Sequence, residues 1–170
     1  MAAGSTYTPI ATTTVSGTST ATVTFSSIAG TYTDLVLVAS GTLIGSTQNL
    51  EMRLNSDSGT NFSRTTLSGT GSAANSGRTT SASQIRLDVY GYWGTTSPTT
   101  TIVQFMNYSN ATTYKTFLAR ANNAGTGVDA EVGLWRSTSA ITQIDLYPTV
   151  GTTEKFAAGS TFTLYGIAAA

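Results

Sequence analysis

The residues best suited to chemistry in this sequence are Asp129 and Glu131, two carboxylates separated by a single residue. In an extended strand this spacing places both on one face, about 7 Å apart, and glycoside hydrolysis needs two carboxylates at about that range. However, Val128, Ala130 and Val132 alternate with them, which is typical of a strand whose apolar side faces a core. The sequence therefore predicts that Asp129 and Glu131 form the solvent-facing side of an amphipathic strand, and it predicts no catalytic residue.

Nucleophilic catalysis lacks its usual partners in this chain. There is no histidine and no cysteine, so neither the imidazole base of a hydrolytic triad nor a thiolate nucleophile is available. The absence of cysteine also excludes disulfides and thiolate metal sites. Lys115 and Lys155 lie in a predicted strand and a predicted loop that offer no recognisable setting for a lysine base. We expect a protein that is not an enzyme and binds no cofactor.

Oxygen-bearing side chains alternate around a glycine in the segment from Asn55 to Asn61, with Asp57 and Gly59 between them. Calcium loops share this layout because the cation takes several oxygens from one tight turn. The closing bidentate glutamate and the two helices of an EF-hand are absent, and Asx side chains stabilise turns without any ion. An ordinary turn is favoured, and Asn55, Asp57 and Asn61 stay a weak candidate metal site.

Aromatic and aliphatic residues supply candidate contacts. Tyr90, Tyr92 and Trp93 cluster at the end of a predicted strand, and Tyr7 and Ile10 are apolar anchors in a threonine-rich amino-terminal segment. Aromatic side chains anchor protein interfaces and stack on sugars, but Trp and Tyr also cap cores with one polar edge in water. A core cap, a protein interface and a glycan platform all stay open for the aromatic cluster.

Charge is scarce and balanced, with 8 basic and 8 acidic residues among 170. The basic residues are scattered from Arg53 to Lys155, whereas nucleic-acid binding needs clustered Lys and Arg. No apolar run is long enough to cross a membrane. The first ten residues lack the basic and apolar regions of a secretory signal, and the initial Met1 suggests a complete gene product. We expect neither a nucleic-acid nor a membrane partner.

Short runs of alternating or continuous apolar residues predict an all-β chain, because no window shows the period of a helix. The pattern indicates an antiparallel β-sandwich or jelly roll of about nine or ten short strands over residues 20–170. Residues 1–19 are predicted to be an extended arm or an edge strand, and 55–83 a loop-rich region with one short strand. The predicted strands are 22–25, 35–38, 50–54, 62–67, 85–89, 102–108, 114–120, 128–135, 141–147 and 161–167.

Five segments of the sequence carry a resemblance, namely 25–28, 32–37, 55–63, 133–141 and 159–167. Together they resemble small virion proteins of tailed phages, including cyanophages. The resemblance covers about residues 20 to 167, and the order of the segments with the closing Leu-Tyr-Gly-Ile makes it specific. It implies a β-sandwich or jelly-roll unit that serves as a head decoration (cement) protein or a fibre tip, commonly as a homotrimer, and it transfers no catalytic residues.

The expected function is therefore structural. The resemblance implies a capsid decoration protein that binds the outer face of the major capsid protein lattice and stabilises the head, located on the virion. The short chain has no stalk, which favours decoration over a fibre. Residues 1–19 are expected to reach neighbouring capsid subunits through backbone hydrogen bonds, unless they form a disordered terminus. The alternative is a tail-fibre or receptor-binding tip that recognises a host surface glycan.

Overall fold

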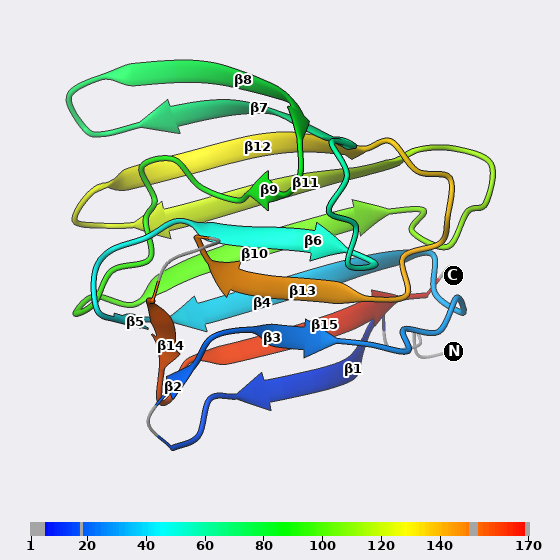
Figure 1. Cartoon of the computed structure of the whole chain (residues 1–170), viewed down its shortest axis with the longest axis horizontal. Coiled ribbons are helices and arrows are strands. Elements are labelled where there is room, and N and C mark those ends of the chain that lie inside the picture. The colour runs from blue at the N-terminus through cyan, green and yellow to red at the C-terminus, as the bar shows by residue number, and fades with distance from the viewer. Residues whose placement is uncertain (1–5, 18, 150–152, 169–170) are drawn as a thin grey trace.

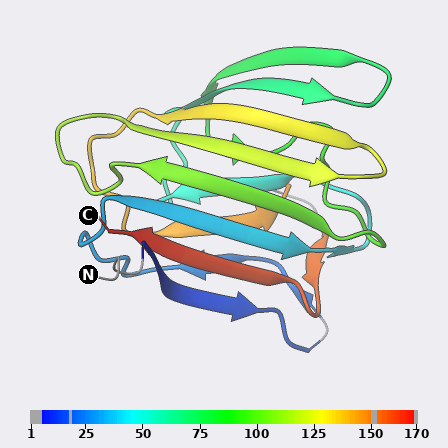
Figure 2. The same ribbon diagram turned by 180° about the vertical axis from the view of Figure 1, so that it is seen from behind.

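The protein folds into two packed β-layers (Figure 1). The computed structural model describes residues 6–17, 19–149 and 153–168. The larger layer is an eight-stranded antiparallel sheet in the order β1-β15-β4-β10-β11-β12-β7-β8, seen from its outer side in Figure 2. Its strands are β1 (Tyr7–Thr14), β4 (Asp34–Gly41), β7 (Phe62–Gly69), β8 (Ala74–Ala82), β10 (Thr99–Met106), β11 (Lys115–Asn123), β12 (Gly127–Trp135) and β15 (Thr161–Ile167).

A second layer of short strands covers the inner face of the large sheet (Figure 1). One part has the order β3-β13-β6-β9 and the other β2-β14-β5. These strands are β3 (Val23–Phe25), β13 (Ile144–Pro148), β6 (Leu50–Leu54), β9 (Ile85–Arg86), β2 (Ser19–Thr20), β14 (Lys155–Ala157) and β5 (Leu43–Ile44).

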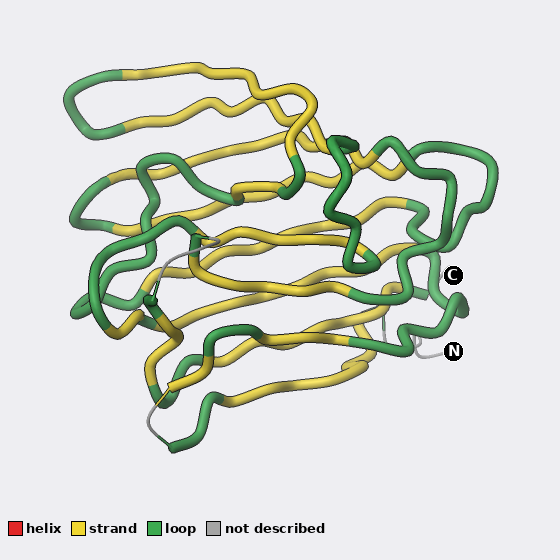
Figure 3. The backbone as a smooth tube through the Cα atoms, viewed as in Figure 1, coloured by secondary structure: helices red, strands yellow, loops and turns green. Residues whose placement is uncertain are grey.

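The predicted all-β, antiparallel class is confirmed. The tube in Figure 3 shows strands and loops throughout the described residues and no helix. It follows that no helix there is long and apolar enough to span a membrane. The described residues form fifteen strands, where the sequence predicted nine or ten. The additional strands are short or polar on both faces, so they lack the alternation of apolar and polar residues that predicts a strand. The jelly-roll topology stays a prediction.

Aromatic side chains fill the space between the layers. The Trp93 ring stacks on Phe162 with centroids 5.7 Å apart, and Phe156 meets both rings edge-on. Phe105 and Phe117 pack together under the middle of the large sheet at 5.9 Å. All five side chains are fully buried. Offset and edge-on aromatic pairs add stability beyond the area they bury, so these rings hold the two layers together.

The burial of β12 is the reverse of the sequence prediction. Asp129 and Glu131 point into the protein with 1% and 4% of their surface exposed, whereas Val128 and Val132 are 54% and 48% exposed. The phase is set by Trp135, which lies on the same side as the two carboxylates and is buried. Since side chains alternate strictly along a strand, burying the indole of Trp135 places the carboxylates inside and the valines outside.

Two other predicted segments differ in the structure. Residues 74–82 were predicted to be loop, but they form β8, whose residues are exposed or half-buried because it pairs only with β7 at the edge of the sheet. The predicted strand 85–89 stops at Arg86. Beyond it, Asp88 is buried between the layers and accepts the Leu50 amide, so the chain leaves the ladder.

The amino-terminal segment lies within the large sheet. Tyr7–Thr14 pairs with β15 of the same chain as an edge strand, with a bulge between Pro9 and Ala11. At this bulge, Ile10 packs against the hydrophobic core. Residues 7–14 are therefore not a free arm that reaches a neighbour; residues 1–5 lie outside the described residues.

Candidate interaction surface

The second layer does not cover the outer face of the large sheet (Figure 2). Exposed aliphatic side chains lie on this face. Leu67 and Leu118 are 62% and 49% exposed, and together with Val128 and Val132 they form what we call the aliphatic patch. Leu118 lies directly opposite Val132, and Leu67 opposite Ala130. Directly opposed side chains in an antiparallel pair are close neighbours, so the patch is one continuous surface over β7, β12 and β11.

A hollow of about 350 Å³ adjoins the aliphatic patch. One wall is Tyr7, whose half-exposed ring packs edge-on against Tyr165 at 6.1 Å. Leu118 and Arg120 of β11 line the hollow as well. The central strands β4 and β10 contribute Val36, Ile102 and Gln104 to the lining. The remaining lining residues are Ala119, Ala130 and Glu131.

Two guanidinium groups lie on this face. Arg120 is exposed and stands opposite Ala130 and Ile102, and Arg78 of β8 is exposed and stands opposite Thr65. Within the described part of the chain, the ion pairs join Arg64 to Glu131 and Arg86 to Glu51. Neither Arg120 nor Arg78 takes part in these pairs, so both remain open to a partner.

The edges of the sheet carry features that discourage pairing with another chain. Edge strand β1 contains Pro9, which has no amide hydrogen, and a bulge next to it. Edge strand β8 carries Arg78, and its ladder with β7 shifts register between Phe62 and Arg64. Proline, bulges and charged side chains are common means of blunting sheet edges. The outer face, and not an edge, is therefore the best candidate for an interaction surface.

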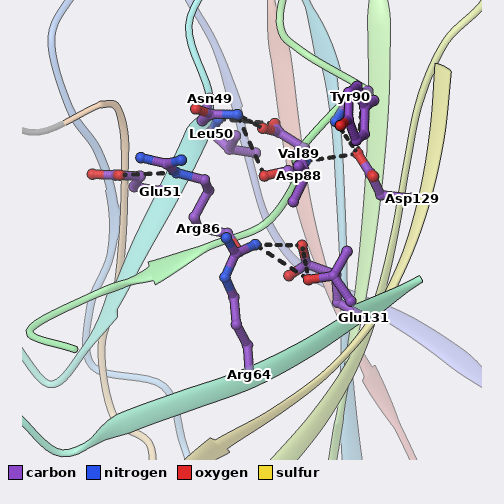
Figure 4. Close-up of polar contacts among 12 residues, drawn as sticks. Asn49, Leu50, Glu51, Arg64, Arg86, Asp88, Val89, Tyr90, Asp129 and Glu131 are labelled. Carbon is purple, nitrogen blue, oxygen red and sulfur yellow. Dashed lines mark hydrogen bonds and ion pairs between the residues drawn. The ribbon is translucent and has the colours of Figure 1, made fainter. Parts of the chain in front are cut away.

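Behind the same strands lies a cluster of buried carboxylates (Figure 4). Asp129 Oδ2 accepts hydrogen bonds from the backbone amides of Val89, Tyr90 and Gly91 at 2.8, 2.9 and 2.7 Å. A Cβ on Gly91 would lie 3.1 Å from this oxygen and 3.0 Å from the Ala121 carbonyl carbon. The carboxylate therefore fixes the connecting segment 87–91 against β12.

Glu131 holds β12 and β7 together from within. Its Oε1 accepts hydrogen bonds from Arg64 Nη1 at 2.7 Å and from Thr66 Oγ1 at 3.1 Å (Figure 4). The Glu131 side chain is completely buried, and its Oε2 has no hydrogen-bond partner. Burial raises the pKa of Glu131 to about 7, although the Arg64 charge and the Thr66 hydroxyl both act to lower it.

Asp88 connects the carboxylate cluster to the second layer. Its side chain accepts hydrogen bonds from the Leu50 amide at 2.9 Å and from the Asn49 side chain. Burial raises the pKa of Asp88 to about 8 because desolvation outweighs these two donors, and the charges of Glu131 and Asp129 add to the rise.

Carboxylates with raised pKa values often mark active sites. Here Asp88, Asp129 and Glu131 are at most 4% exposed, so a substrate cannot reach them. Among the residues the structure describes, no group of three or more acidic, histidine or cysteine side chains could hold a metal ion. The geometry assigns the cluster to packing of the two layers.

The predicted contact residues occupy different settings. Trp93 is fully buried and donates its Nε1–H to Thr101 Oγ1 at 3.1 Å, so it is a core residue and not a contact surface. Tyr90 and Tyr92 are half-buried, and their rings tilt toward each other with centroids 6.4 Å apart. Ile10 is an internal anchor. Tyr7 alone of the predicted contact residues lies on the outer face beside the aliphatic patch.

The oxygens of the candidate calcium loop are bound by protein donors. Asp57 accepts from the Gly59 amide at 2.7 Å, from Trp135 Nε1 at 2.7 Å and from Asn61 Nδ2 at 2.9 Å. Asn55 instead accepts two backbone amides of the segment before β13. Although partial burial opposes it, hydrogen bonds from Trp135, Asn61 and Gly59 lower the pKa of Asp57. This arrangement is that of an Asx turn tied to the core.

We expect Asp57→Ala to lower the free energy of unfolding by about 2 kcal/mol, because it removes three hydrogen bonds and leaves the indole N–H of Trp135 without its acceptor. Asn61→Ala, which removes one of the three, should cost about 1 kcal/mol. Urea unfolding with and without calcium chloride measures both effects. A calcium-dependent rise in wild-type stability that Asp57→Ala abolishes would revive the metal interpretation.

Neither the aliphatic patch nor Arg120 is predicted by the sequence patterns. The phase of β12 was readable from Gly133 and Trp135, which share the side of Asp129 and Glu131. A large tryptophan side chain favours burial more strongly than several valines, so the position of Trp135 was the better guide to the buried side of β12.

Comparison with known proteins adds no relative: the chain matches no protein-family model, no curated protein and no solved structure.

Proposed function

We propose that this chain is a structural protein of a virion surface, specifically a decoration protein that docks on the outer face of the major capsid protein lattice and stabilises the head. The observation that carries the proposal is the aliphatic patch on an uncovered sheet face, formed while carboxylates of the same strand are buried. Contiguous exposed apolar surface on a soluble domain commonly marks an interaction site. The resemblance to tailed-phage virion proteins supplies the setting.

Docking uses the sheet face and not strand exchange. The edge strand Tyr7–Thr14 already pairs with β15, and its outer edge is blunted by Pro9. Docking through this face would bury the aliphatic patch, and such an apolar contact needs few charged residues. This agrees with the low charge of the chain. Trimer formation around the docking site would multiply weak contacts through effective concentration.

A second candidate function rests on Tyr90 and Tyr92. Their half-buried rings form a pair at one end of the sandwich, and such pairs can stack on sugar rings in a tail-fibre or receptor-binding tip. Tyr92→Ala tests this function on a glycan array, with Tyr114→Ala as the control because Tyr114 is an exposed tyrosine elsewhere. A glycan signal lost only in Tyr92→Ala would favour the tail.

The decoration proposal predicts that Leu118→Thr combined with Val132→Thr lowers occupancy on heads stripped of the protein by about tenfold or more. The two side chains are directly opposed, and removing their apolar contacts costs the complex more than about 1.4 kcal/mol. Occupancy is measured by sedimentation of heads with added protein. Threonine is β-branched, a shape that a strand favours, and both positions are on the exposed face, so the urea midpoint should change little.

Ile44→Thr is the matched control, since Ile44 is an equally exposed aliphatic residue on the second layer. It should bind as the wild type does. If the double variant also binds normally, the outer face is not the docking surface. Labelling the protein in intact particles gives an independent outcome: a label on the tail would overturn the decoration role in favour of the second candidate.

A further inference from the structure

The hollow beside the aliphatic patch combines an apolar lining with one cation. Ile102 and Leu118 contribute its aliphatic walls, and Arg120 reaches it from β11. Its volume of about 350 Å³ is at the lower end of the range of small binding sites. The hollow can therefore take one or two side chains of a partner, and not a whole folded element.

Arg120 belongs to neither of the two ion pairs found among the described residues. Its cross-strand neighbours are Ile102 on β10 and Ala130 on β12. The acidic residues of β12, Asp129 and Glu131, face the opposite side of the sheet. An arginine at the centre of an apolar surface is a frequent hot spot of protein interfaces, and it pairs strongly with a carboxylate because two N–H groups can bind both oxygens.

The geometry points to an acidic, aliphatic segment of a partner protein as the occupant of this hollow. In the complex, a partner carboxylate pairs with Arg120, and an adjacent aliphatic side chain packs between Leu118 and Ile102. The inference rests on the proposed function in one respect, that the outer face is the docking surface, and it adds the chemistry of the partner.

Charge argues against other occupants. A second copy that presents the same face would bring Arg120 and Arg78 toward like charges. Glu131 is among the residues that line the hollow, but its carboxylate is buried on the other side of the sheet and pairs with Arg64, so it does not offset the charge of Arg120. A glycan presents many hydroxyl groups that need hydrogen-bond partners. The lining offers it Gln104, Arg120 and Tyr7 as polar side chains, because the Glu131 carboxylate is buried on the other side of the sheet. A protein segment that is both acidic and apolar can pair with Arg120 and also pack against the aliphatic lining of the hollow.

A displayed peptide library tests the charge preference with the full-length protein as bait. The peptides carry Val, Ile or Leu at alternate positions, and Asp, Glu, Lys, Arg, Ser or Asn at the intervening ones. Wild-type protein should enrich Asp and Glu, and Arg120→Glu should enrich Lys and Arg. Against an acidic peptide selected by the wild type, Arg120→Glu should lose about thirtyfold in affinity or more.

Lys155→Glu is the matched control, because Lys155 is an exposed cation on the second layer; it should select as the wild type does. The inference is overturned if no peptide is enriched, if enrichment shows no acidic preference, or if Arg120→Glu keeps that preference. Arg120-dependent binding on a glycan array without peptide enrichment, or an Arg120-dependent dimer in sedimentation, overturns it in favour of those occupants.

The outcome for the proposed function is separate. If Leu118→Thr with Val132→Thr lowers head occupancy while Arg120→Glu leaves the peptide preference unchanged, the docking face stands and the acidic partner fails. If the peptide preference inverts but every outer-face variant occupies heads normally, the hollow binds acidic segments and the decoration function fails.

Discussion

At pH 8, the Asp88→Asn variant is expected to be more stable than the wild type by about 5 kcal/mol, whereas near pH 4 the two should be similar. The pKa of Asp88 is raised from 3.8 to about 8 by burial, so the folded protein keeps a proton that the unfolded chain releases. Between these values each pH unit costs about 1.4 kcal/mol of stability per such proton. The stability of the wild type should therefore fall as the pH rises from about 4 to 8.

Glu131 acts in the same direction, since burial raises its pKa from 4.5 to about 7. The asparagine variant resembles protonated Asp88, because one amide atom still accepts a hydrogen bond from the Leu50 amide or from Asn49 while the charge is gone. It should therefore lose the part of the pH dependence that extends toward pH 8. Urea unfolding across this range measures the slope for both proteins.

Asp57→Asn is the control with the opposite sign. Hydrogen bonds lower the pKa of Asp57 despite its partial burial, so its stabilising effect is present above pH 3.8 and is lost as the pH falls through the lowered value. The same chemical change should therefore destabilise the protein at neutral pH. A wild-type stability that stays flat or rises between pH 5 and 8, or an unchanged slope in Asp88→Asn, would contradict the assignment of a proton to the buried cluster.

Gly133→Ala is expected to lower the free energy of unfolding by about 3 kcal/mol. Gly133 lies directly opposite Phe117 in the β11–β12 ladder, and the Phe117 ring occupies the space that a Cβ at residue 133 would need. Phe117 is fully buried against Phe105, so the ring cannot move away without disturbing the core. Urea or thermal unfolding measures the loss.

Gly77→Ala is the matched control, because a Cβ at residue 77 meets nothing within 4 Å on the edge strand β8. Its effect should lie within about 0.5 kcal/mol of zero, or be stabilising through the unfolded state. Should Gly133→Ala fail to fold, the Phe117→Leu background keeps the test open. There, adding Gly133→Ala should cost markedly less than in the wild type, since the two positions are coupled. An equal cost in both backgrounds would rule out the clash.

The sequence by itself determined the class of the fold and several of its strands. The strands at 50–54 and 161–167 have the predicted bounds, because an apolar period of two is a local property that a half-buried strand must have. The sequence also determined which chemistry is impossible, since a chain with no histidine or cysteine has neither an imidazole base nor a thiolate. These conclusions need no knowledge of neighbouring strands.

The tertiary structure decided which side of β12 is buried, and the position of Trp135 was the signal for it in the sequence. The alternation of Val128 and Asp129 fits a strand with either side buried. Three contacts favour the observed side: the burial of Trp135, the packing of the Phe117 ring over Gly133, and the hydrogen bonds from the amides of 89–91 to Asp129. A carboxylate can be buried where several donors converge on it, and those donors come from residues about 40 positions away in the chain. Successive side chains of a strand point to opposite faces of the sheet. The residues of the aliphatic patch and Arg120 therefore face the solvent because their neighbours in the chain are buried.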